Sequence, residues 1–243
     1  MAEIIEGRNA VVESLRSGAR LERILIADGL PSHPALDEII ERARGAGVQV
    51  RHVARREIEA LSERGAHQGV VAYAAPYAYA ELASMIRAAE GLERALVVVL
   101  DHVTDPGNLG AIVRSVEVAG GQGVIIPKDR SAAVGQVAHK SSAGATAYLP
   151  IARVTNLTRA IEELKTADFW VAGADERASD DLWRAPLDGR VALVLGSEGA
   201  GLSRLVKDRC DFLVSIPVAG HVTSLNVAQA TTLLSFEWVR RGR

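Results

Sequence analysis

The strongest constraint on the fold is a regular alternation of short apolar runs and amphipathic helical patterns across residues 91–243. Apolar runs are typical of buried strands, and apolar side chains every three or four residues are typical of helices that cover a sheet. Such alternation forms a parallel sheet with helices on both faces, so we expect an α/β domain. The predicted strands are 96–100, 123–127, 169–172, 191–195 and 212–216, and the predicted helices are 106–119, 155–166, 200–208 and 224–241.

The first third of the chain predicts a second, smaller α/β domain over residues 1–75. A segment that contains Pro76 and a short helix at 81–89 form the predicted linker, residues 76–90, and the larger domain then covers 91–243. In the smaller domain the predicted helices are 10–16, 34–44 and 55–62, and the predicted strands are 23–27, 48–53 and 69–73.

Composition places the chain among globular proteins, since 48% of its residues are hydrophobic. No apolar run approaches the length of a membrane span, and the N-terminus has no signal-peptide pattern. The single cysteine cannot form an internal disulfide, and the six histidines show no zinc-ligand spacing. We therefore expect a cytoplasmic protein without a metal site. The net charge of −2 does not by itself indicate nucleic acid, although it can hide a local basic patch.

A polar segment, residues 105–114, follows the first strand of the larger domain and begins a helix. Asp105 suits the N-cap of that helix and Pro106 suits its first position. Backbone donors at a helix start, the amide of Asn108 and the projecting cation of Arg114 together suit an anionic or polar ligand. A capped surface helix with one solvated arginine explains the same residues equally well.

A second polar loop, residues 196–201 with the sequence GSEGAG, follows the predicted strand 191–195. Its glycines have the order G-x-x-G-x-G, so it lacks the dinucleotide fingerprint G-x-G-x-x-G. It also lacks the G-x-S-x-G of a nucleophile elbow and the G-x-x-x-x-G-K-[ST] of a phosphate loop. A glycine-rich turn explains the glycines, whereas Glu198 can bind polar hydrogens or a cation.

A third loop, residues 216–226, precedes the last predicted helix. Ser224 or Thr223 can cap that helix, and Asn226 would lie in its first turn, where leucine or alanine would favour the helix more. Because ligands bind at the carboxyl ends of parallel strands, we expect the three loops to converge. A further polar stretch, residues 139–144, can contact a phosphate or the substrate, but a solvated loop is the favoured prediction.

Taken together, the three loops resemble the motifs of the SpoU/TrmH family of the SPOUT superclass. The matching residues are Asp105-x-x-Asn108-x-Gly110-x-x-x-Arg114, Gly196-x-Glu198-Gly199-x-Gly201 and Ile216-Pro217-x-x-Gly220-x-x-Ser224-Leu225-Asn226. These are S-adenosylmethionine-dependent RNA ribose 2′-O-methyltransferases, so the resemblance implies that activity and that cofactor. It also implies a C-terminal trefoil knot, a rare exception to unknotted topology, and a homodimer formed through the C-terminal domain.

The resemblance further implies a role for each motif residue. The catalytic residues would be Arg114, Asn108, Glu198, Ser224 and Asn226, and the cofactor-binding residues would be Leu195, Gly196, Gly201, Ile216, Val218, Ser224, Leu225 and Asn226. Asn108 and Asn226 would position the ribose or its hydroxyl, and Glu198 would orient Arg114 or a backbone amide. Ser224 would cap the last helix and touch the cofactor.

The smaller domain is similar to the family's ribosomal-protein-like RNA-binding domain in the segments 7–11 and 67–72. The implied RNA-binding residues are Arg8, Gln68 and Lys140. With the segments 100–106 (LDHVTDP) and 127–132 (PKDRSA), the whole chain is most similar to the RlmB branch. That branch methylates a guanosine in the P-site loop of 23S ribosomal RNA, so that RNA is the expected partner. A transfer RNA or another ribosomal nucleotide is the alternative substrate. A non-catalytic RNA-binding protein and a nicotinamide-dependent oxidoreductase are the alternative functions.

Methyl transfer to a hydroxyl requires that the reactants are oriented and that the hydroxyl proton is removed. A guanidinium holds its proton too tightly to act as a base. We therefore expect Arg114 to stabilise negative charge on the ribose oxygen and to grip an adjacent phosphate. The proton would leave through that phosphate or through water.

Overall fold

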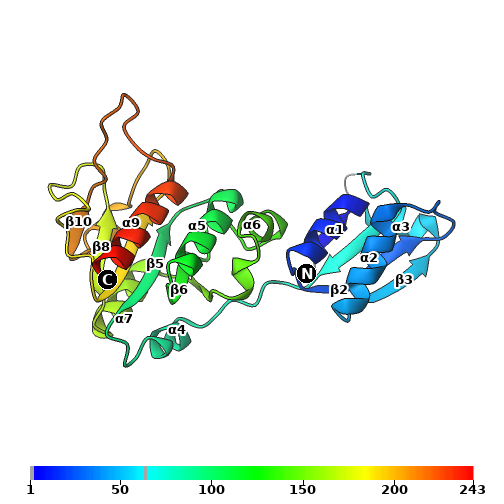
Figure 1. Ribbon diagram of the computed structural model, residues 1–243, viewed down its shortest axis with the longest axis horizontal. Helices are drawn as coiled ribbons and strands as arrows, with labels where there is room; N and C mark the ends of the chain where they lie inside the picture. Colours follow the sequence, from blue (N-terminus) through cyan, green and yellow to red (C-terminus); the bar gives the residue numbers. More distant parts are fainter. Residues whose placement is uncertain (1–2, 63–64, 243) are drawn as a thin grey trace. The chain divides into compact units, whose positions relative to one another are not determined.

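The computed structural model describes residues 3–62 and 65–242 and divides the chain after Ala78 into two units, residues 1–78 and 79–243. Each unit has its own sheet and its own buried core (Figure 1). Both units are α/β structures, as the alternation of strand and helix patterns predicts.

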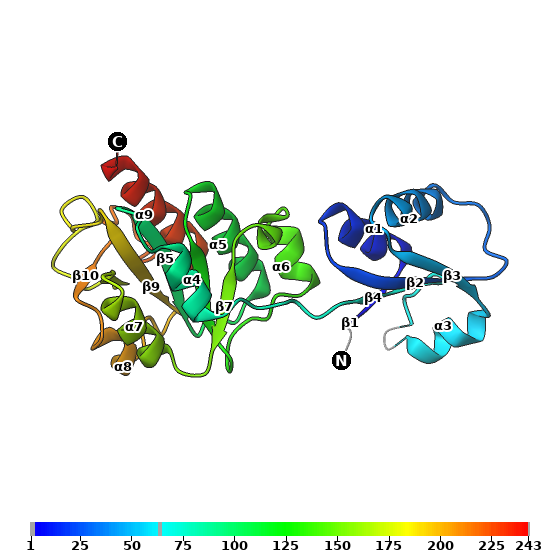
Figure 2. The same cartoon turned by 90° about the horizontal axis from the view of Figure 1, so that it is seen from below.

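The smaller unit is a four-stranded sheet with helices on both faces. Its elements are β1 (Glu3–Glu6), α1 (Arg8–Arg16), β2 (Leu21–Ala27), α2 (Pro34–Gly45), β3 (Gln49–Val53), α3 (Arg55–Leu61) and β4 (Val70–Ala74). The strand order is β1-β4-β2-β3, with β2 and β3 parallel and the other pairs antiparallel. Figure 2 shows α1 and α2 on one side of the sheet and α3 on the other. Strand β1 is absent from the prediction because four residues are too few for a clear alternating pattern.

The larger unit is a six-stranded parallel sheet in the order β10-β8-β9-β5-β6-β7. Its elements are α4 (Leu82–Ala88), β5 (Ala95–Asp101), α5 (Pro106–Val118), β6 (Gly123–Pro127), α6 (Gln136–Ser141), the short 3₁₀ turn η1 (Ala145–Ala147), β7 (Ile151–Val154), α7 (Leu157–Thr166), β8 (Trp170–Ala174), β9 (Arg190–Gly196), α8 (Arg204–Lys207), β10 (Phe212–Val214) and α9 (Val227–Arg241). The predicted parallel sheet is confirmed.

Helices cover both faces of this sheet, as predicted. Helices α5 and α9 contact each other on one face, while α4, α7 and α8 contribute to the core on the other face (Figure 2). Every residue of the central strand β5 is buried, because helices pack on it from both sides. The carboxyl ends of β5 and β9 therefore extend from a rigid part of the unit.

Helix α6 occupies a segment that was predicted to be a solvated loop, and that prediction is wrong for residues 139–141. Its buried Ala138 packs close to α5. A Cβ atom on Gly110 of α5 would overlap Ser141 Oγ and the carbonyl oxygen of Ala138. Gly110 therefore allows the two helices to approach closely, and this contact, which no polar pattern reveals, holds α6 in place.

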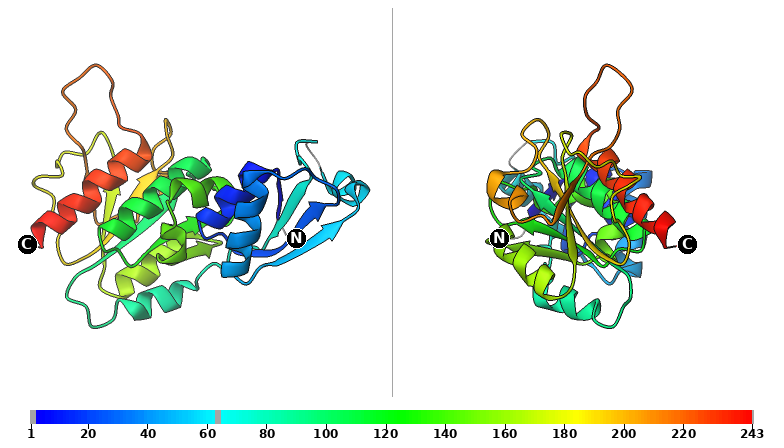
Figure 3. Two further views of the ribbon diagram at one scale, coloured as in Figure 1. Left: turned by 45° about the vertical axis from the view of Figure 1, so that its right-hand side comes forward. Right: turned by 90° about the vertical axis from the view of Figure 1, so that its left-hand side faces the viewer.

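The boundaries around the last strand also differ from the prediction. Helix α8 is restricted to Arg204–Lys207, and α9 begins at Val227 rather than at residue 224. Residues 215–226 instead form a long loop between β10 and α9, the orange segment in Figure 3. Strand β7 is a further element that the sequence analysis does not predict. The trefoil knot stays a prediction. None of the helices in residues 3–62 and 65–242 is long and apolar enough to span a membrane.

Candidate functional site

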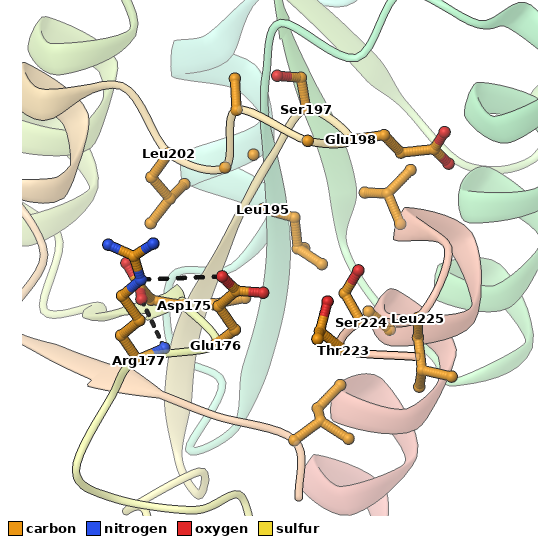
Figure 4. Close-up of a pocket in the computed structure, with 18 of the residues that line it drawn as sticks. Asp175, Glu176, Arg177, Leu195, Ser197, Glu198, Leu202, Thr223, Ser224 and Leu225 are labelled. Carbon is orange, nitrogen blue, oxygen red and sulfur yellow. Dashed lines mark hydrogen bonds and ion pairs between the residues drawn. The ribbon is translucent and has the colours of Figure 1, made fainter. Parts of the chain in front are cut away.

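A cavity of about 770 Å³ lies at the carboxyl ends of β8, β9 and β10. The segments that follow these strands and the start of α9 form its walls. Figure 4 shows Leu195, Thr223 and Ser224 around it, with Glu176 on another wall. The carboxyl ends of parallel strands are the usual ligand-binding edge of an α/β sheet. The cavity is therefore the principal candidate for a ligand site.

Residues 196–201, hereafter the glycine loop, fold back on themselves at the edge of this cavity. The backbone N–H of Gly201 donates to the carbonyl of Ser197 at 2.9 Å. A Cβ atom on Gly196 would overlap the backbone of Gly201, and Gly199 has a φ of 80°. Glycine is thus required at residue 196 by close approach and favoured at residue 199 by left-handed backbone.

The buried carboxylate of Asp101, at the end of β5, fixes the segment that leaves the glycine loop. Asp101 pairs with Gly196 in the strand register. Its Oδ2 accepts a hydrogen bond from the backbone N–H of Ser203 at 2.7 Å, and its Oδ1 lies 2.5 Å from Nδ1 of His102. The loop is therefore anchored at its start by strand pairing and just beyond its end by a carboxylate. Asp101 is not among the predicted site residues.

The residues predicted to bind the cofactor all lie on the wall of this one cavity. They are Leu195, Gly196, Gly201, Ile216, Val218, Ser224, Leu225 and Asn226. They come from the end of β9, from the glycine loop and from residues 215–226. The fold thus brings two motifs that are distant in sequence to a common surface, although contact with a cofactor stays a prediction.

Three polar side chains, one from each motif, form a hydrogen-bonded cluster that we term the amide cluster. The amide nitrogen of Asn226 donates to Glu198 Oε1 at 2.5 Å and to Asn108 Oδ1 at 3.0 Å. The amide of Asn108 also donates to Glu198 Oε1, at 3.1 Å. Glu198 and Asn226 line the cavity, and Asn108 joins them from the first turn of α5. One carboxylate oxygen therefore holds two amides in place.

Asn226 is also the N-cap of α9, since its Oδ1 accepts a hydrogen bond from the backbone N–H of Ala228 at 2.9 Å. The prediction that Ser224 or Thr223 caps this helix is wrong, because α9 begins only at Val227. Ser224 and Thr223 are exposed and line the cavity instead. A single side chain thus uses its oxygen for the helix and its nitrogen for the amide cluster.

Arg114 lies on α5, outside both the cavity wall and the amide cluster. The start of α5 is as predicted: Asp105 is the N-cap, and its Oδ1 accepts from the backbone N–H of Asn108 at 2.6 Å. Six helical residues correspond to about 9 Å, which separates Asn108 from Arg114 along the axis. Arg114 is exposed and forms no ion pair within the described part of the chain, so Glu198 does not orient it there.

The wall opposite the amide cluster carries charged residues that the sequence analysis does not identify. Asp175, Glu176 and Arg177 follow β8, and Lys207 ends α8. Nζ of Lys207 donates to Asp175 Oδ2 at 2.5 Å, and this hydrogen bond lowers the pKa of Asp175 although burial opposes the change. For the three residues after β8, the position just beyond the predicted strand 169–172 is the available signal, since residues at strand ends converge at one edge, whereas no such signal exists for Lys207.

The predicted RNA-binding residues fall into both units. In the smaller unit, Nε of Arg8 donates to the backbone carbonyl of Gln68 at 3.1 Å, so the two residues are in contact. Gln68 has a positive φ of 48° and is exposed. In the larger unit, Lys140 is exposed near the end of α6. Their contact with RNA stays a prediction.

The amide cluster and the cavity together can bind a polar ligand and hold a second group beside it. The cluster offers fixed amide and carboxylate groups, and the cavity offers apolar surface and backbone donors. Among the residues that the structure describes, no group of three His, Cys, Asp or Glu side chains is arranged to hold a metal ion.

Two family profiles match the chain, one for each unit. The profile described as the SpoU rRNA Methylase family matches residues 95–236. The profile described as RNA 2′-O ribose methyltransferase substrate binding matches residues 4–80.

Curated relatives match over almost the whole chain. A protein of Bacillus subtilis (strain 168), named as a TrmH family tRNA/rRNA methyltransferase, YacO, is 41% identical over 240 residues, which cover 98% of this chain and 96% of the relative. A protein of Staphylococcus aureus (strain COL) with the same family name is 41% identical over 239 residues, with 98% and 96% coverage.

Solved structures match the fold of the chain as well. The SpoU methyltransferase AviRb from Streptomyces viridochromogenes, in complex with the cofactor AdoMet, has a TM-score of 0.74 at 27% identity and covers 99% of this chain and 90% of its own. An AdoMet-bound rRNA methyltransferase from Sinorhizobium meliloti has a TM-score of 0.70 at 28% identity, with 99% and 87% coverage.

Proposed function

Because the chain belongs to the SpoU rRNA methylase family, we propose that it transfers a methyl group from S-adenosylmethionine to the ribose 2′-hydroxyl of a guanosine in 23S ribosomal RNA. Membership of the family and the cofactor-bound structural relatives make it an S-adenosylmethionine-dependent RNA methyltransferase. The position of the methyl group and the identity of the RNA are the proposal. The observation that carries it is the amide cluster at the edge of the cavity.

The residues of the cavity fit S-adenosylmethionine. A volume of about 770 Å³ falls within the range of small-molecule sites, about 300 to 1,000 Å³. Leu195, Ile216 and Leu225 offer apolar surface for the adenine ring, and the backbone of the glycine loop offers donors and acceptors. Asp175 and Glu176 offer carboxylates to hydroxyl and ammonium groups. When bound, the cofactor supplies an electrophilic methyl group on a positively charged sulfur.

The amide cluster is suited to orient the ribose. Glu198 holds the side chains of Asn108 and Asn226 in one arrangement, so little rearrangement is needed when the substrate arrives. We assign the two amides to the positioning of the ribose and its hydroxyl, and Ser224 to contact with the cofactor. In this arrangement Glu198 acts through the two asparagines rather than through Arg114.

Arg114 is assigned the stabilisation of negative charge on the ribose oxygen and contact with a neighbouring phosphate. A guanidinium presents its donors in a fork that matches phosphate oxygens, and it keeps its charge throughout the reaction. The hydroxyl proton then leaves through that phosphate or through water, because arginine cannot accept it.

We further propose that the chain forms a homodimer through α5 and α9 of its larger unit. Val118, one turn after Arg114 on α5, is 62% exposed. Leu233 and Phe236 on α9, which packs against α5, are 37% and 43% exposed. Large apolar side chains exposed on adjacent helices are typical of an interface. Such an interface would lie beside Arg114 and would bring that arginine near a second copy.

The relatives support an RNA substrate but are named for both tRNA and rRNA. The family description favours ribosomal RNA, with a guanosine of the P-site loop as the proposed target, and the substrate-binding profile of the smaller unit supports transfer to a ribose 2′-hydroxyl. We assign Arg8, Gln68 and Lys140 to contact with that RNA, and we propose a cytoplasmic location because ribosomal RNA is modified there. A transfer RNA is the second candidate substrate.

The decisive experiment is to methylate total RNA from cells that lack the gene, with purified enzyme and isotopically labelled S-adenosylmethionine, and to map the labelled nucleotide. RNA from wild-type cells is the control, since its target is already modified. We expect label on a ribose of 23S ribosomal RNA only in RNA from the deletion strain. Label confined to transfer RNA would show that transfer RNA, and not 23S ribosomal RNA, is the substrate. Label on a base would contradict methylation of the ribose 2′-hydroxyl.

A further inference from the structure

The sheet of the smaller unit has one face that is only partly covered by a helix. Helices α1 and α2 pack on the opposite face, whereas α3, with seven residues, is the helix on this one (Figure 2). Ile58 and Leu61 of α3 pack with Leu25 and Val53 of the strands. Toward the start of β2 and β3, the same face carries exposed side chains.

Strand pairing aligns these side chains in a row across all four strands. Tyr73 pairs with Ile4 on one side and with Arg23 on the other, and Arg23 pairs with Gln49. Arg51 follows Gln49 by two residues and therefore lies on the same face. Arg23, Gln49 and Arg51 are exposed, and Tyr73 is half-buried. The row thus places an aromatic ring, an amide and two arginines on one surface.

A groove of about 360 Å³ lies beside Arg23, Arg51 and Tyr73 of this surface. Its floor is apolar, with Leu25 and Val53, and Arg23 and Arg51 belong to its walls. The guanidinium carbon of Arg23 lies 4.1 Å from the centroid of the Tyr73 ring, so the cation stacks on the ring. The lining residues are Arg23, Leu25, Arg51, Val53, Glu57, Ala60, Leu61 and Tyr73.

The charge of the groove is positive. Arg23 and Arg51 outnumber the acid on the lining, Glu57, and neither arginine forms an ion pair within residues 3–62 and 65–242. The two groove arginines therefore remain available to a negatively charged ligand.

We propose that this groove binds a single-stranded segment of RNA, an inference that rests on RNA being the substrate. A base stacks on the exposed face of the Arg23 guanidinium, which Tyr73 supports from behind, and Arg51 binds a phosphate with its forked donors. Gln49 pairs with Arg23 just outside the groove lining, and its amide is available to a neighbouring base that extends past the groove. Sheets that carry stacking side chains are a common way to recognise unpaired nucleotides.

This groove is separate from the predicted contact at Arg8 and Gln68. Gln68 precedes β4, whereas Tyr73 lies near the end of that strand. A turn at Gln68 and Gly69 leads into β4, and the strand from Val70 to Tyr73 alone spans about 10 Å. The smaller unit therefore has two places at which RNA can be held.

The test measures binding of a fluorescently labelled single-stranded oligoribonucleotide to the full chain by anisotropy. The variants are Arg23→Ala and Arg51→Ala, and the matched control is Arg44→Ala, which removes an exposed arginine from α2 on the opposite face. We expect Arg23→Ala to weaken binding on the order of tenfold through lost stacking. Arg51→Ala should lower the slope of log affinity against log salt by about 1, as expected for one lost phosphate contact.

Binding of S-adenosylmethionine by each variant reports whether the larger unit is intact, and it should be unchanged. The proposal is overturned if Arg23→Ala and Arg44→Ala weaken RNA binding equally, or if neither groove variant weakens it. The second result is also the one expected if the groove binds a protein partner instead of RNA. If the wild-type enzyme methylates 23S ribosomal RNA while the groove variants bind RNA normally, the RNA-binding groove is wrong and the proposed function still holds. If no ribosomal RNA is methylated while the groove variants still lose RNA binding, the proposed function is wrong and the RNA-binding groove still holds.

Discussion

The side-chain nitrogen of Asn226 lies 2.5 Å from Oε1 of Glu198, and this hydrogen bond joins the start of α9 to the glycine loop. The oxygen of the same amide accepts from Ala228 and caps the helix. Because both bonds use one planar group, the orientation of the helix start and the arrangement of the amide cluster are set together. Substitutions at Asn226 can separate these two contributions.

Asn226→Ser keeps a capping oxygen but removes the amide donor, whereas Asn226→Ala removes both. We expect Asn226→Ala to lower the free energy of unfolding by about 1 kcal/mol and Asn226→Ser to leave it nearly unchanged. Both should slow single-turnover methyl transfer to a similar extent, since both disconnect Glu198. Thermal denaturation and rapid-quench assays measure the two effects. A serine variant with wild-type transfer would show that the amide donor is not needed.

Glu198→Ala should release both asparagines at once. We expect the methyl-transfer rate to fall on the order of 100-fold, because the orientation of the ribose would no longer be fixed. Glu198→Gln keeps one acceptor oxygen and should lose less. The control is Glu90→Ala, which removes an exposed glutamate just after α4. Single-turnover rates with saturating RNA give the comparison, and an unchanged rate for Glu198→Ala would remove this residue from the site.

Arg114→Lys keeps the positive charge but loses the fork that matches a phosphate. We expect the transfer rate to fall on the order of 100-fold, while the affinity for S-adenosylmethionine is unchanged because Arg114 is not on the cavity wall. Arg159→Lys on α7, which packs on the other face of the sheet, is the matched control. A near-wild-type rate for Arg114→Lys would contradict the proposed role of the fork.

Acid should destabilise the larger unit through Glu237, which is buried on α9 and bonded to Arg240 and Arg241 at 2.7 and 2.8 Å. The hydrogen bonds from Arg240 lower the pKa of Glu237 below its ordinary value of 4.5, burial opposes this, and Arg241 adds to it. The folded state then binds fewer protons than the unfolded state. The stabilisation is therefore full above pH 4.5 and is lost as the pH falls through the lowered pKa.

Urea unfolding at a series of acidic pH values tests this expectation. Tryptophan fluorescence is a suitable signal, since Trp170, Trp183 and Trp238 all belong to the larger unit. We expect Glu237→Gln to be less stable than wild type near neutral pH and to show a smaller loss of unfolding free energy as the pH falls below 4.5. If the unfolding free energies of the two proteins depend on pH in the same way, Glu237 is not the cause of the acid sensitivity.

Phe236→Glu places a charge on the exposed stripe of α9 and should dissociate the proposed homodimer. Light scattering coupled to size-exclusion chromatography measures the mass directly. Leu205→Glu, which alters a 70% exposed leucine on α8, is the matched control and should leave the mass unchanged. A wild-type protein that is monomeric at high concentration would contradict the dimer, as would a dimeric Phe236→Glu variant.

Most of the fold could be predicted from the sequence because its strands are short apolar runs and its helices are amphipathic. The start of α5 was predicted to the residue, since Asp105 and Pro106 each have a strong local preference there. Helix α6 could not be predicted, because its position depends on its close approach to α5 at Gly110. The start of α9 was misplaced because Ser224 and Asn226 are both good caps, and only the path of residues 215–226 decides between them.

The candidate site shows the same limit. Residues within the motifs could be assigned to one cavity, because strand ends converge in a parallel sheet. The pairing of Glu198 with two asparagines depends on the distances between loops, which spacing along the chain does not encode. Asp175 and Lys207 lie outside the motifs. In the sequence, Asp101 looks like the residue that ends an apolar strand, and nothing indicates that its carboxylate binds another segment. Such residues are recognised only when the fold brings their partners to them.

The anchoring of the glycine loop by Asp101 has a consequence for the thermodynamics of cofactor binding. With one end paired to β5 and the other held by the hydrogen bond to Ser203, the loop loses most of its conformational entropy when the chain folds. Little entropy is then left to lose when a ligand enters the cavity, so more of the interaction energy appears as affinity. The buried carboxylate thus acts on binding without touching what is bound.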